Sequence, residues 1–228
     1  QDRRKDEFLA MLAHELRNPL APIASAAELL KIGIASEERV RRSSEVISRQ
    51  VKHMTSLVDD LLDISRVTRG LIQLENIVVD VKATIRSAVE QSRPLIESRG
   101  HSLAIAQDPE GVRVMGDPNR LVQVVANLLN NAAKYTPRGG RILLAVERNG
   151  AVVRIRVQDN GIGIDQALLP QVFDLFTQAE RTPDRSQGGL GIGLALVKNV
   201  VSLHGGEVMA HSDGPGAGST FTVSLHTI

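Results

Sequence analysis

Residues 13–23, AHELRNPLAPI, place three chemically competent side chains within two helical turns. Apolar residues recur around them at spacings of three and four, which predicts a helix with one apolar seam: Leu9, Leu12, Leu16, Leu20, Ile23, Ala27 and Leu30. At about 100° per residue, His14 points roughly 160° away from the centre of that seam. Asn18 lies on the same outward face, and Glu15 is adjacent. The pattern predicts an exposed imidazole beside a carboxylate and an amide.

An imidazole in this setting can act as a nucleophile or a proton carrier near neutral pH. The carboxylate of Glu15 can accept a hydrogen bond from one ring nitrogen and leave the other nitrogen free to attack. A solvated histidine on a polar helix face explains the same residues when they are taken alone. The other five histidines have no comparable neighbours, and none of the six makes a metal-ligand pattern.

Two segments of the second half have the residue types of a nucleotide site. In NLLNNAAKYTP, 127–137, Asn127 and Asn131 are one helical turn apart, and Lys134 is one turn further on. Amide oxygens suit Mg²⁺, and a lysine neutralises phosphate charge. In QDNGIGID, 158–165, Asp159 ends a predicted strand and can accept a hydrogen bond from an adenine amino group. The two glycines that follow it, Gly161 and Gly163, let a ring approach the backbone.

Two glycine-rich segments follow. In QGGLGIGLAL, 187–196, Gly189, Gly191 and Gly193 precede and open a predicted helix, an arrangement that cradles phosphate with backbone N–H groups. It fits neither a Walker motif nor a dinucleotide fingerprint. GPGAGSTF, 214–221, is a glycine turn that enters the last predicted strand. The polar loop between 158–165 and 187–196 holds Phe173 and Phe176, which suggests a mobile lid anchored by two aromatic residues.

The elements that must position these residues fall into two parts. Residues 1–69 contain one glycine and read as two long helices, with a second apolar seam through Ile47, Val51, Met54, Val58 and Leu61. Two antiparallel helices cannot bury two such stripes alone, which favours a dimeric four-helix bundle; a coiled-coil linker is the plainer alternative. Residues 70–228 alternate strands and helices. They predict strands at 71–81, 102–106 and 112–116, helices at 82–99, 118–134 and 190–204, a hairpin turning at Asn149-Gly150 and a closing strand pair. This order predicts an α+β sandwich with helices on one face of a mixed sheet.

Composition limits the other possibilities. The net charge of +1 gives no electrostatic footprint for nucleic acid, and the absence of cysteine excludes disulfides and thiolate-ligated zinc. No apolar run reaches the roughly 18 to 20 residues of a membrane span, and no signal peptide is visible. We expect this portion to be cytoplasmic. The chain begins with Gln1, so an upstream anchor or sensor domain stays open, and the full-length protein could be soluble or membrane-anchored.

Six segments, in this order, resemble the catalytic core of bacterial sensor histidine kinases of two-component systems, over essentially the whole chain. FLAMLAHELRNPLAPI resembles the phosphoacceptor box, NLLNNAAKYTP the asparagine box and DNGIGI the first glycine box. VFDLFTQ resembles the phenylalanine box, GGLGIGL the second glycine box and GAGSTF the last one. The resemblance implies a homodimeric helical hairpin for dimerisation and histidine phosphotransfer, 1–69, followed by a Bergerat-type ATP-binding domain, 70–228.

The resemblance also implies roles. ATP would phosphorylate His14, Glu15 would orient the imidazole and take its proton, and Asn18 would position water for a phosphatase reaction. Pro19 would let the helix bend. The phosphoryl group would pass to an aspartate of a response-regulator receiver domain. Asn131 would bind Mg²⁺, supported by Asn127. The other implied nucleotide contacts are Lys134, Tyr135, Asp159, Gly161, Gly163, Gly189, Gly191, Gly193 and Thr220.

One position departs from the family, and two other functions remain as rivals. Many members have a basic residue where this chain has Gln178, and Arg181 or Arg185 could substitute for it. An ATPase machine of the gyrase, MutL or chaperone class would share the asparagine and glycine boxes but has no use for a His-Glu pair on a dimer helix. A dimer scaffold that binds nucleotide without turnover is the second rival. The sequence identifies neither the signal nor the receiver, nor whether transfer occurs within or between subunits.

Overall fold

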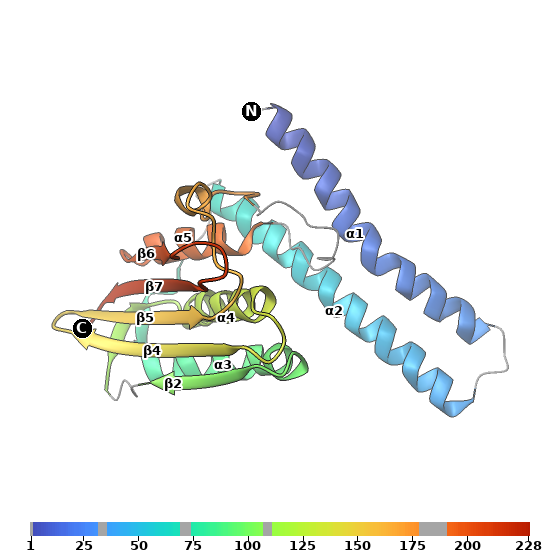
Figure 1. Cartoon of the computed structure of the whole chain (residues 1–228), viewed down its shortest axis with the longest axis horizontal. Helices are drawn as coiled ribbons and strands as arrows, with labels where there is room; N and C mark the ends of the chain where they lie inside the picture. Colours follow the sequence, from blue (N-terminus) through green and yellow to red (C-terminus); the bar gives the residue numbers. More distant parts are fainter. Residues whose placement is uncertain (1, 32–35, 69–73, 107–110, 178–190) are drawn as a thin grey trace.

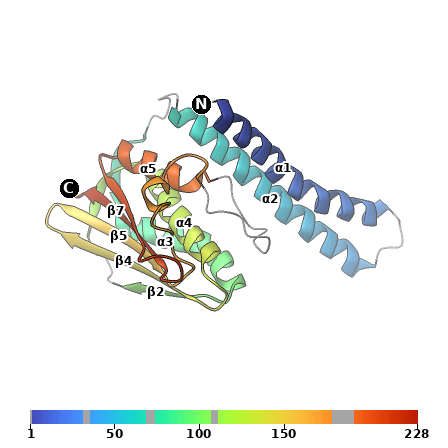
Figure 2. The ribbon, with the colours of Figure 1, turned by 45° about the horizontal axis from the view of Figure 1, so that its top comes forward.

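The computed structural model describes residues 2–31, 36–68, 74–106, 111–177 and 191–228 (Figure 1). Within the two long helices some side chains lie outside this description, among them those of His14 and Glu15. The helix α1 (Asp2–Lys31) and the helix α2 (Glu37–Thr68) lie side by side as an antiparallel hairpin, here called the stalk (Figures 1 and 2). The two predicted helices are therefore confirmed. None of the described helices is long and apolar enough to cross a membrane.

The residues that face inward within the stalk differ in part from the predicted seams. The inward-facing repeat is Leu12, Leu16, Pro19, Ile23 and Ala26 on α1, and Ser43, Ile47, Gln50, Met54, Leu57 and Leu61 on α2, with Ala27 and Val46 half-buried beside it. Both sets alternate spacings of four and three, as expected for a two-helix seam. Leu20, Val51 and Val58 were predicted in the seams, but they are 44–49% exposed. Each helix thus carries a second apolar stripe that its partner in the hairpin does not cover.

The two prolines of α1 follow the predicted phosphoacceptor turn. Pro19 and Pro22 have no backbone N–H, so the carbonyl groups four residues earlier, at Glu15 and Asn18, receive no helical hydrogen bond from them. The helix nevertheless continues through both prolines to Lys31, and Pro19 is buried. The turn after His14 is therefore a weak point of α1, although the helix is unbroken.

The rest of the chain, residues 74–228, is here called the nucleotide domain. Five strands form one sheet, in the order β2 (Ser102–Ala106), β4 (Arg141–Asn149), β5 (Val152–Asp159), β7 (Ser219–His226) and β6 (Glu207–His211). The strands β2 and β4 are parallel and the other pairs antiparallel, so the sheet is mixed as predicted. The helices α3 (Val81–Ser98), α4 (Pro118–Tyr135) and α5 (Gly193–Leu203) cover one face of it (Figure 1).

A small second sheet and a short helix complete the domain. The strand β1 (Ile77–Asp80) pairs with β3 (Arg113–Gly116), and the 3₁₀ helix η1 spans Leu169–Gln171. The predicted strand over 71–81 was too long at its end, because the Asp80 side chain accepts the N–H of Lys82 and starts α3 at Val81. Asn149 pairs with Val152, so the hairpin turns at Gly150-Ala151, one residue later than predicted.

The core of the nucleotide domain is built mainly from aliphatic side chains. Alternate residues of β4, β5 and β7 are buried against the helices, including Leu144, Val157 and Val223. Each such side chain contributes about 1.5 to 3 kcal/mol when it is fully buried. The α+β sandwich is confirmed, whereas the boundary between residues 69 and 70 stays a prediction.

Candidate nucleotide site

The described residues enclose a cavity of about 580 Å³, a volume suited to a nucleotide-sized ligand. Its walls come from α4, the segment between β5 and η1, the start of α5 and the start of β7. The apolar part of the lining includes Ile162, Ile164, Leu168, Val172, Leu194 and Phe221, and the polar part includes Asn131, Asp159, Asp165, Thr177 and Ser219. A largely apolar slot with a few polar groups is what a flat heterocycle with a polar edge requires.

Asp159, at the end of β5, is the most constrained polar group of the cavity. The residue is 6% exposed. Its Oδ1 accepts the N–H of Gly161 at 2.8 Å, and its Oδ2 accepts the hydroxyl of Ser219 at 2.6 Å. Because two donors hold the carboxylate, its orientation is set, and each oxygen keeps a lone pair that can accept from a ligand. The arrangement fits an amino group on a buried ring, as predicted for adenine.

Ser219, and not the predicted Thr220, lines the cavity. Successive residues of a strand point to opposite faces of the sheet, so Thr220 points away from the cavity when Ser219 points toward Asp159. The turn before β7 makes this register possible. Gly218 has φ +75°, and a Cβ there would lie 2.1 Å from the carbonyl oxygen of Asp159. The motif indicated the right turn, but its letters alone did not show which of the two hydroxyls faces inward.

Removing each hydroxyl in turn distinguishes the roles of Ser219 and Thr220. We expect Ser219→Ala to weaken ATP binding about three- to tenfold, because the lost hydrogen bond to Asp159 contributes about 1 kcal/mol. Thr220→Val should leave the affinity within twofold, since that hydroxyl does not line the cavity. Calorimetric titration with an ATP analogue measures both. Equal losses in the two variants would contradict the placement.

The glycines of the first glycine box serve the protein backbone more than the ligand. A Cβ on Gly161 would lie 2.5 Å from the carbonyl oxygen of Tyr135 and 2.6 Å from Asp159 Oδ1. Gly163 has φ +70°, and a Cβ there would lie 2.0 Å from the carbonyl oxygen of Gly214. The two glycines thus let the end of α4 and the loop at Gly214 pack closely around Asp159, and their role in admitting a ring stays a prediction. Gly163 also lines the cavity, and Gly161 does not.

The α4 wall carries the predicted asparagine box. Asn131 and Tyr135 line the cavity. Asn127, one turn before Asn131, has a buried side-chain nitrogen without a hydrogen-bond partner among the described residues. A buried amide in this state fits a site that receives a polar ligand group. Lys134 is exposed at the end of α4 and does not line the cavity.

The second glycine box forms the entry to α5. Gly189 lies outside the described residues. Gly191 has φ +68°, and a Cβ there would lie 2.9 Å from the carbonyl oxygen of Thr177. Gly193 is the first residue of α5, and the residue after it, Leu194, lines the cavity. The described glycines therefore position the start of α5 beside the cavity without lining it.

The two phenylalanines of the predicted lid anchor serve different neighbours. Phe173 packs edge-on against Phe221, a cavity residue, with ring centroids 6.2 Å apart and an interplanar angle of 85°. Phe176 has φ +67°, a strained value for a bulky residue, and its N–H donates to the carbonyl of Gly191 at 3.1 Å. The predicted lid itself, with Gln178, Arg181 and Arg185, lies outside the described residues.

The phosphoacceptor box lies on α1. His14 and Glu15 belong to the helix, but their side chains lie outside the description, so their predicted exposure and pairing stay predictions. Asn18, one turn later, is exposed as predicted. Leu12, two residues before His14, packs against the buried cluster that Leu57 of α2 forms with Ile192, the residue before α5. The turn that carries His14 therefore lies close to the nucleotide domain.

A mixed sheet covered on one face by helices, with a strand-end carboxylate and an asparagine-bearing helix around the cavity, defines an ATP-binding domain. Residues 116–227 match the family model of the histidine kinase-, DNA gyrase B- and HSP90-like ATPases. Residues 4–70 match the His Kinase A (phospho-acceptor) domain. The chain belongs to the sensor histidine kinases, and it comprises their helical hairpin and catalytic domain.

Several known proteins are similar over nearly the whole chain. It is 36% identical over 221 residues to the sensor-like histidine kinase SenX3 of Mycobacterium bovis, covering 96% of this chain and 53% of that protein. It is 34% identical over 225 residues to the autoinducer 2 sensor kinase/phosphatase LuxQ of Vibrio parahaemolyticus, covering 96% of this chain and 26% of that protein. The solved structure of full-length ShkA in complex with AMPPNP superposes with a TM-score of 0.70 at 28% identity, covering 97% of this chain and 46% of that one. The chain thus spans about a quarter to about half of these relatives.

Proposed function

We propose that the chain is an ATP-dependent protein-histidine kinase that phosphorylates its own His14 and passes the phosphoryl group to an aspartate of a response-regulator receiver domain. One observation carries the proposal: the oriented carboxylate of Asp159 in a nucleotide-sized cavity, on the same chain as a helix with a His-Glu pair. The similarity to ShkA, whose structure holds an ATP analogue, supports ATP as the ligand.

The cavity residues bind and orient the nucleotide. Asp159 accepts from the adenine amino group, and Gly161 and Ser219 keep its carboxylate in place. The apolar walls exclude water from the ring. Asn131 faces the phosphate end from α4, with Asn127 behind it, and Lys134 at the end of α4 adds positive charge. Phosphoryl transfer depends mainly on such positioning and charge neutralisation.

Asn131 would hold Mg²⁺, and the unpartnered amide of Asn127 fits a polar group at that place. When bound, the ion would supply charge neutralisation to the phosphate oxygens. The asparagines keep a neutral amide lining, which suits a hard cation that takes most of its ligands from phosphate and water.

On the stalk, Glu15 would accept a hydrogen bond from one imidazole nitrogen of His14 and hold the other nitrogen toward the terminal phosphate. The N–P bond forms as the bond between the terminal phosphate and ADP breaks, and the imidazole proton passes to Glu15. The exposed face around Asn18 would receive the receiver domain. Asn18 could there position water for the phosphatase reaction that the name of LuxQ includes.

Labelling with [γ-³²P]ATP tests the proposal. We expect the chain to become radioactive, and we expect the label to be lost in acid and kept in alkali, because the P–N bond of phosphohistidine is acid-labile. Steady phosphate release without labelled protein would favour the gyrase-like ATPase. Tight nucleotide binding with neither label nor turnover would favour the scaffold.

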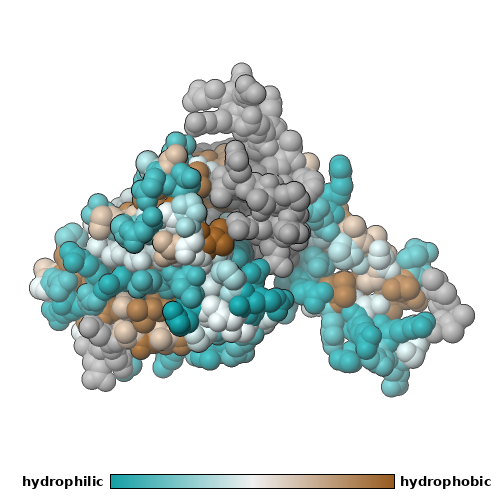
Figure 3. All heavy atoms as spheres, viewed as in Figure 1, coloured by the Kyte–Doolittle hydropathy of each residue, from teal (hydrophilic) through white to brown (hydrophobic). Residues whose placement is uncertain are grey.

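We further propose that the stalk dimerises into a four-helix bundle. The second apolar stripe of each helix supports this, since Leu20 on α1 and Val51, Val58 and Leu62 on α2 are all 44–49% exposed. Figure 3 shows apolar side chains among polar ones on the visible part of the stalk surface. Covering these stripes requires a partner, and a second copy of the hairpin offers matching ones.

Charges placed on the stripe should separate the dimer. We expect the double variant Val51→Glu, Val58→Glu to sediment as a monomer, because two carboxylates cannot be buried unpaired in the bundle. Arg49→Glu with Lys52→Glu, at exposed polar positions of the same helix, is the control and should stay dimeric. A dimeric Val51/Val58 variant would disprove this interface. Analytical ultracentrifugation gives the masses.

A further inference from the structure

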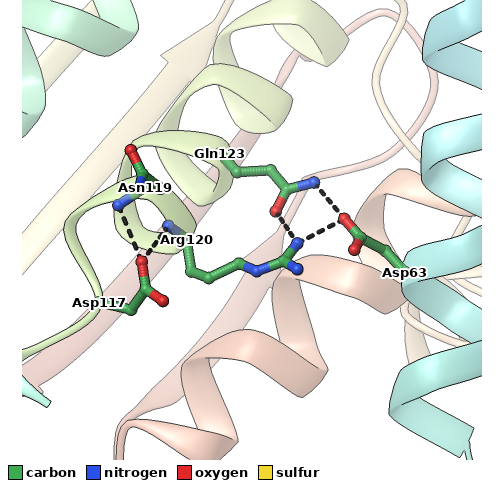
Figure 4. A network of polar contacts seen from close by, with 5 residues as sticks. All are labelled: Asp63, Asp117, Asn119, Arg120 and Gln123. Atoms are coloured by element: carbon green, nitrogen blue, oxygen red, sulfur yellow. Dashed lines mark hydrogen bonds and ion pairs between the residues drawn. The ribbon is translucent and has the colours of Figure 1, made fainter. Parts of the chain in front are cut away.

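A charged contact joins the stalk to the nucleotide domain at a point away from the cavity. Arg120 Nη1 on α4 forms an ion pair with Asp63 Oδ2 on α2 (Figure 4). Gln123 Nε2 donates to the same oxygen at 2.8 Å, and Gln123 Oε1 accepts from Arg120 Nη1 at 2.9 Å. The side chains of Arg120 and Asp63 are only 22% and 10% exposed. We call Asp63, Arg120 and Gln123 the docking triad.

The α4 end of the triad is firmly fixed within its own domain. The side chain of Asp117 caps α4 by accepting the N–H groups of Asn119 and Arg120 (Figure 4). The N–H of Asp117 donates to His204 Nε2 at 2.9 Å, which ties this end of α4 to the end of α5. A displacement of Asp63 would therefore move α4 together with the rest of the nucleotide domain.

A second contact lies beside the triad and is apolar. Leu57 of α2 and Ile192 at the start of α5 are 6% and 2% exposed, and Leu12, Leu61, Leu175 and Phe176 pack against them. We call these six residues the docking cluster. Thr177 and Leu194, which are neighbours of Phe176 and Ile192 in sequence, line the nucleotide cavity. The docking cluster thus brings the rim of the cavity against the stalk, in a cluster that includes Leu12 of α1.

The two contacts differ in what they can specify. Six apolar side chains can slide over one another with little change in buried area, so the docking cluster alone leaves the orientation loose. An ion pair of low exposure adds little net stability but penalises misaligned arrangements, because each displaced charge loses its partner. Two donors from α4 converge on one oxygen of Asp63, which fixes both distance and rotation.

We propose that the docking triad sets the orientation in which the nucleotide domain docks on its own stalk, and that this orientation controls the rate of phosphoryl transfer to His14. The inference rests on the proposed kinase function. None of the three residues lines the cavity, so they are positioning residues that act through α4. Since the triad joins α2 and α4 of the same chain, the proposal implies transfer within one subunit.

The test separates rate from affinity. We expect Asp63→Ala to slow labelling of His14 by about tenfold or more, since a misplacement of about 1 Å can cost a factor of 100, while ATP affinity stays within twofold. Asp59→Ala, an exposed aspartate one turn earlier on α2, should label at the wild-type rate. Single-turnover labelling and calorimetric titration give the two quantities, and circular dichroism checks the fold.

Rescue excludes a merely structural role. The chain has no cysteine, so Asp63→Cys with Gln123→Cys can be bridged selectively by a bifunctional maleimide. We expect slow labelling before bridging and recovery after it. Unchanged labelling in Asp63→Ala would overturn the inference, and faster labelling would too, because docking would then hold the kinase back. If the wild-type chain does not label at all, the kinase proposal fails instead.

Discussion

His14→Gln should reduce labelling from [γ-³²P]ATP to background while ATP binding stays unchanged. Glutamine keeps a polar side chain on the helix but has no nucleophilic ring nitrogen, so no N–P bond can form. Calorimetric titration should give the wild-type affinity, since no α1 side chain that the structure describes lines the cavity. Labelling and binding together therefore locate the loss in the acceptor and not in the nucleotide site.

A matched histidine provides the control. His211 on β6 is exposed and pairs with Asp213 on the surface of the nucleotide domain. His211→Gln should label at the wild-type rate. Retained label in His14→Gln, or a label that survives acid, would show that another residue is the acceptor.

Asp159→Asn should weaken ATP binding about 30- to 160-fold. The amide is the same size as the carboxylate, but one acceptor oxygen becomes an NH₂ group. An NH₂ group cannot accept from the ligand amino group or from the Gly161 N–H, whichever of the two it faces. A lost hydrogen bond to a charged group in a buried site costs about 2 to 3 kcal/mol, which corresponds to this range.

The thermal unfolding temperature of Asp159→Asn should also be measured, because Asp159 orients the turn at Gly161 as well. An unchanged unfolding temperature shows that the loss of affinity does not come from a loss of fold. Asp174→Asn is the control: it changes an exposed aspartate near the cavity that is not part of its lining. A near-normal affinity in folded Asp159→Asn would remove this residue from the adenine contact. An equal loss in Asp174→Asn would point to a general effect of charge.

The sequence predicted the order of elements and most of the cavity, because these depend on local patterns. The helix predicted from residue 118 does begin at Pro118, where the side chain of Asp117 caps it. The predicted Asp159 does end a strand inside the cavity, and Asn131 faces it from a helix. Such placements need only helix and strand periodicity and the sequence of a few turns.

What was wrong or missed depends on the choice between faces and on contacts across domains. The stalk has two apolar stripes per helix, and residue type alone cannot say which stripe faces inward. Leu20 was therefore predicted in the inward seam, whereas Pro19 is the buried residue at that turn. Ser219 and Thr220 are chemically alike, and only the register of β7 separates them. Asp63 and Arg120 are 57 residues apart, and nothing local marks them as a pair.

The helix α4 carries two members of the docking triad, Arg120 and Gln123, near one end and the asparagine box near the other. Gln123 and Asn131 are eight residues apart on this uninterrupted helix, a span of about 12 Å. A rotation of α4 about its contact with the stalk therefore displaces Asn131 more than it displaces Gln123. A tilt of about 10° at Gln123 would sweep Asn131 through about 2 Å, as far as the margin between a reactive and an unreactive approach. A signal that turns α2 by about 10° would therefore switch the chemistry by moving the nucleotide domain as one body, with the cavity keeping its shape.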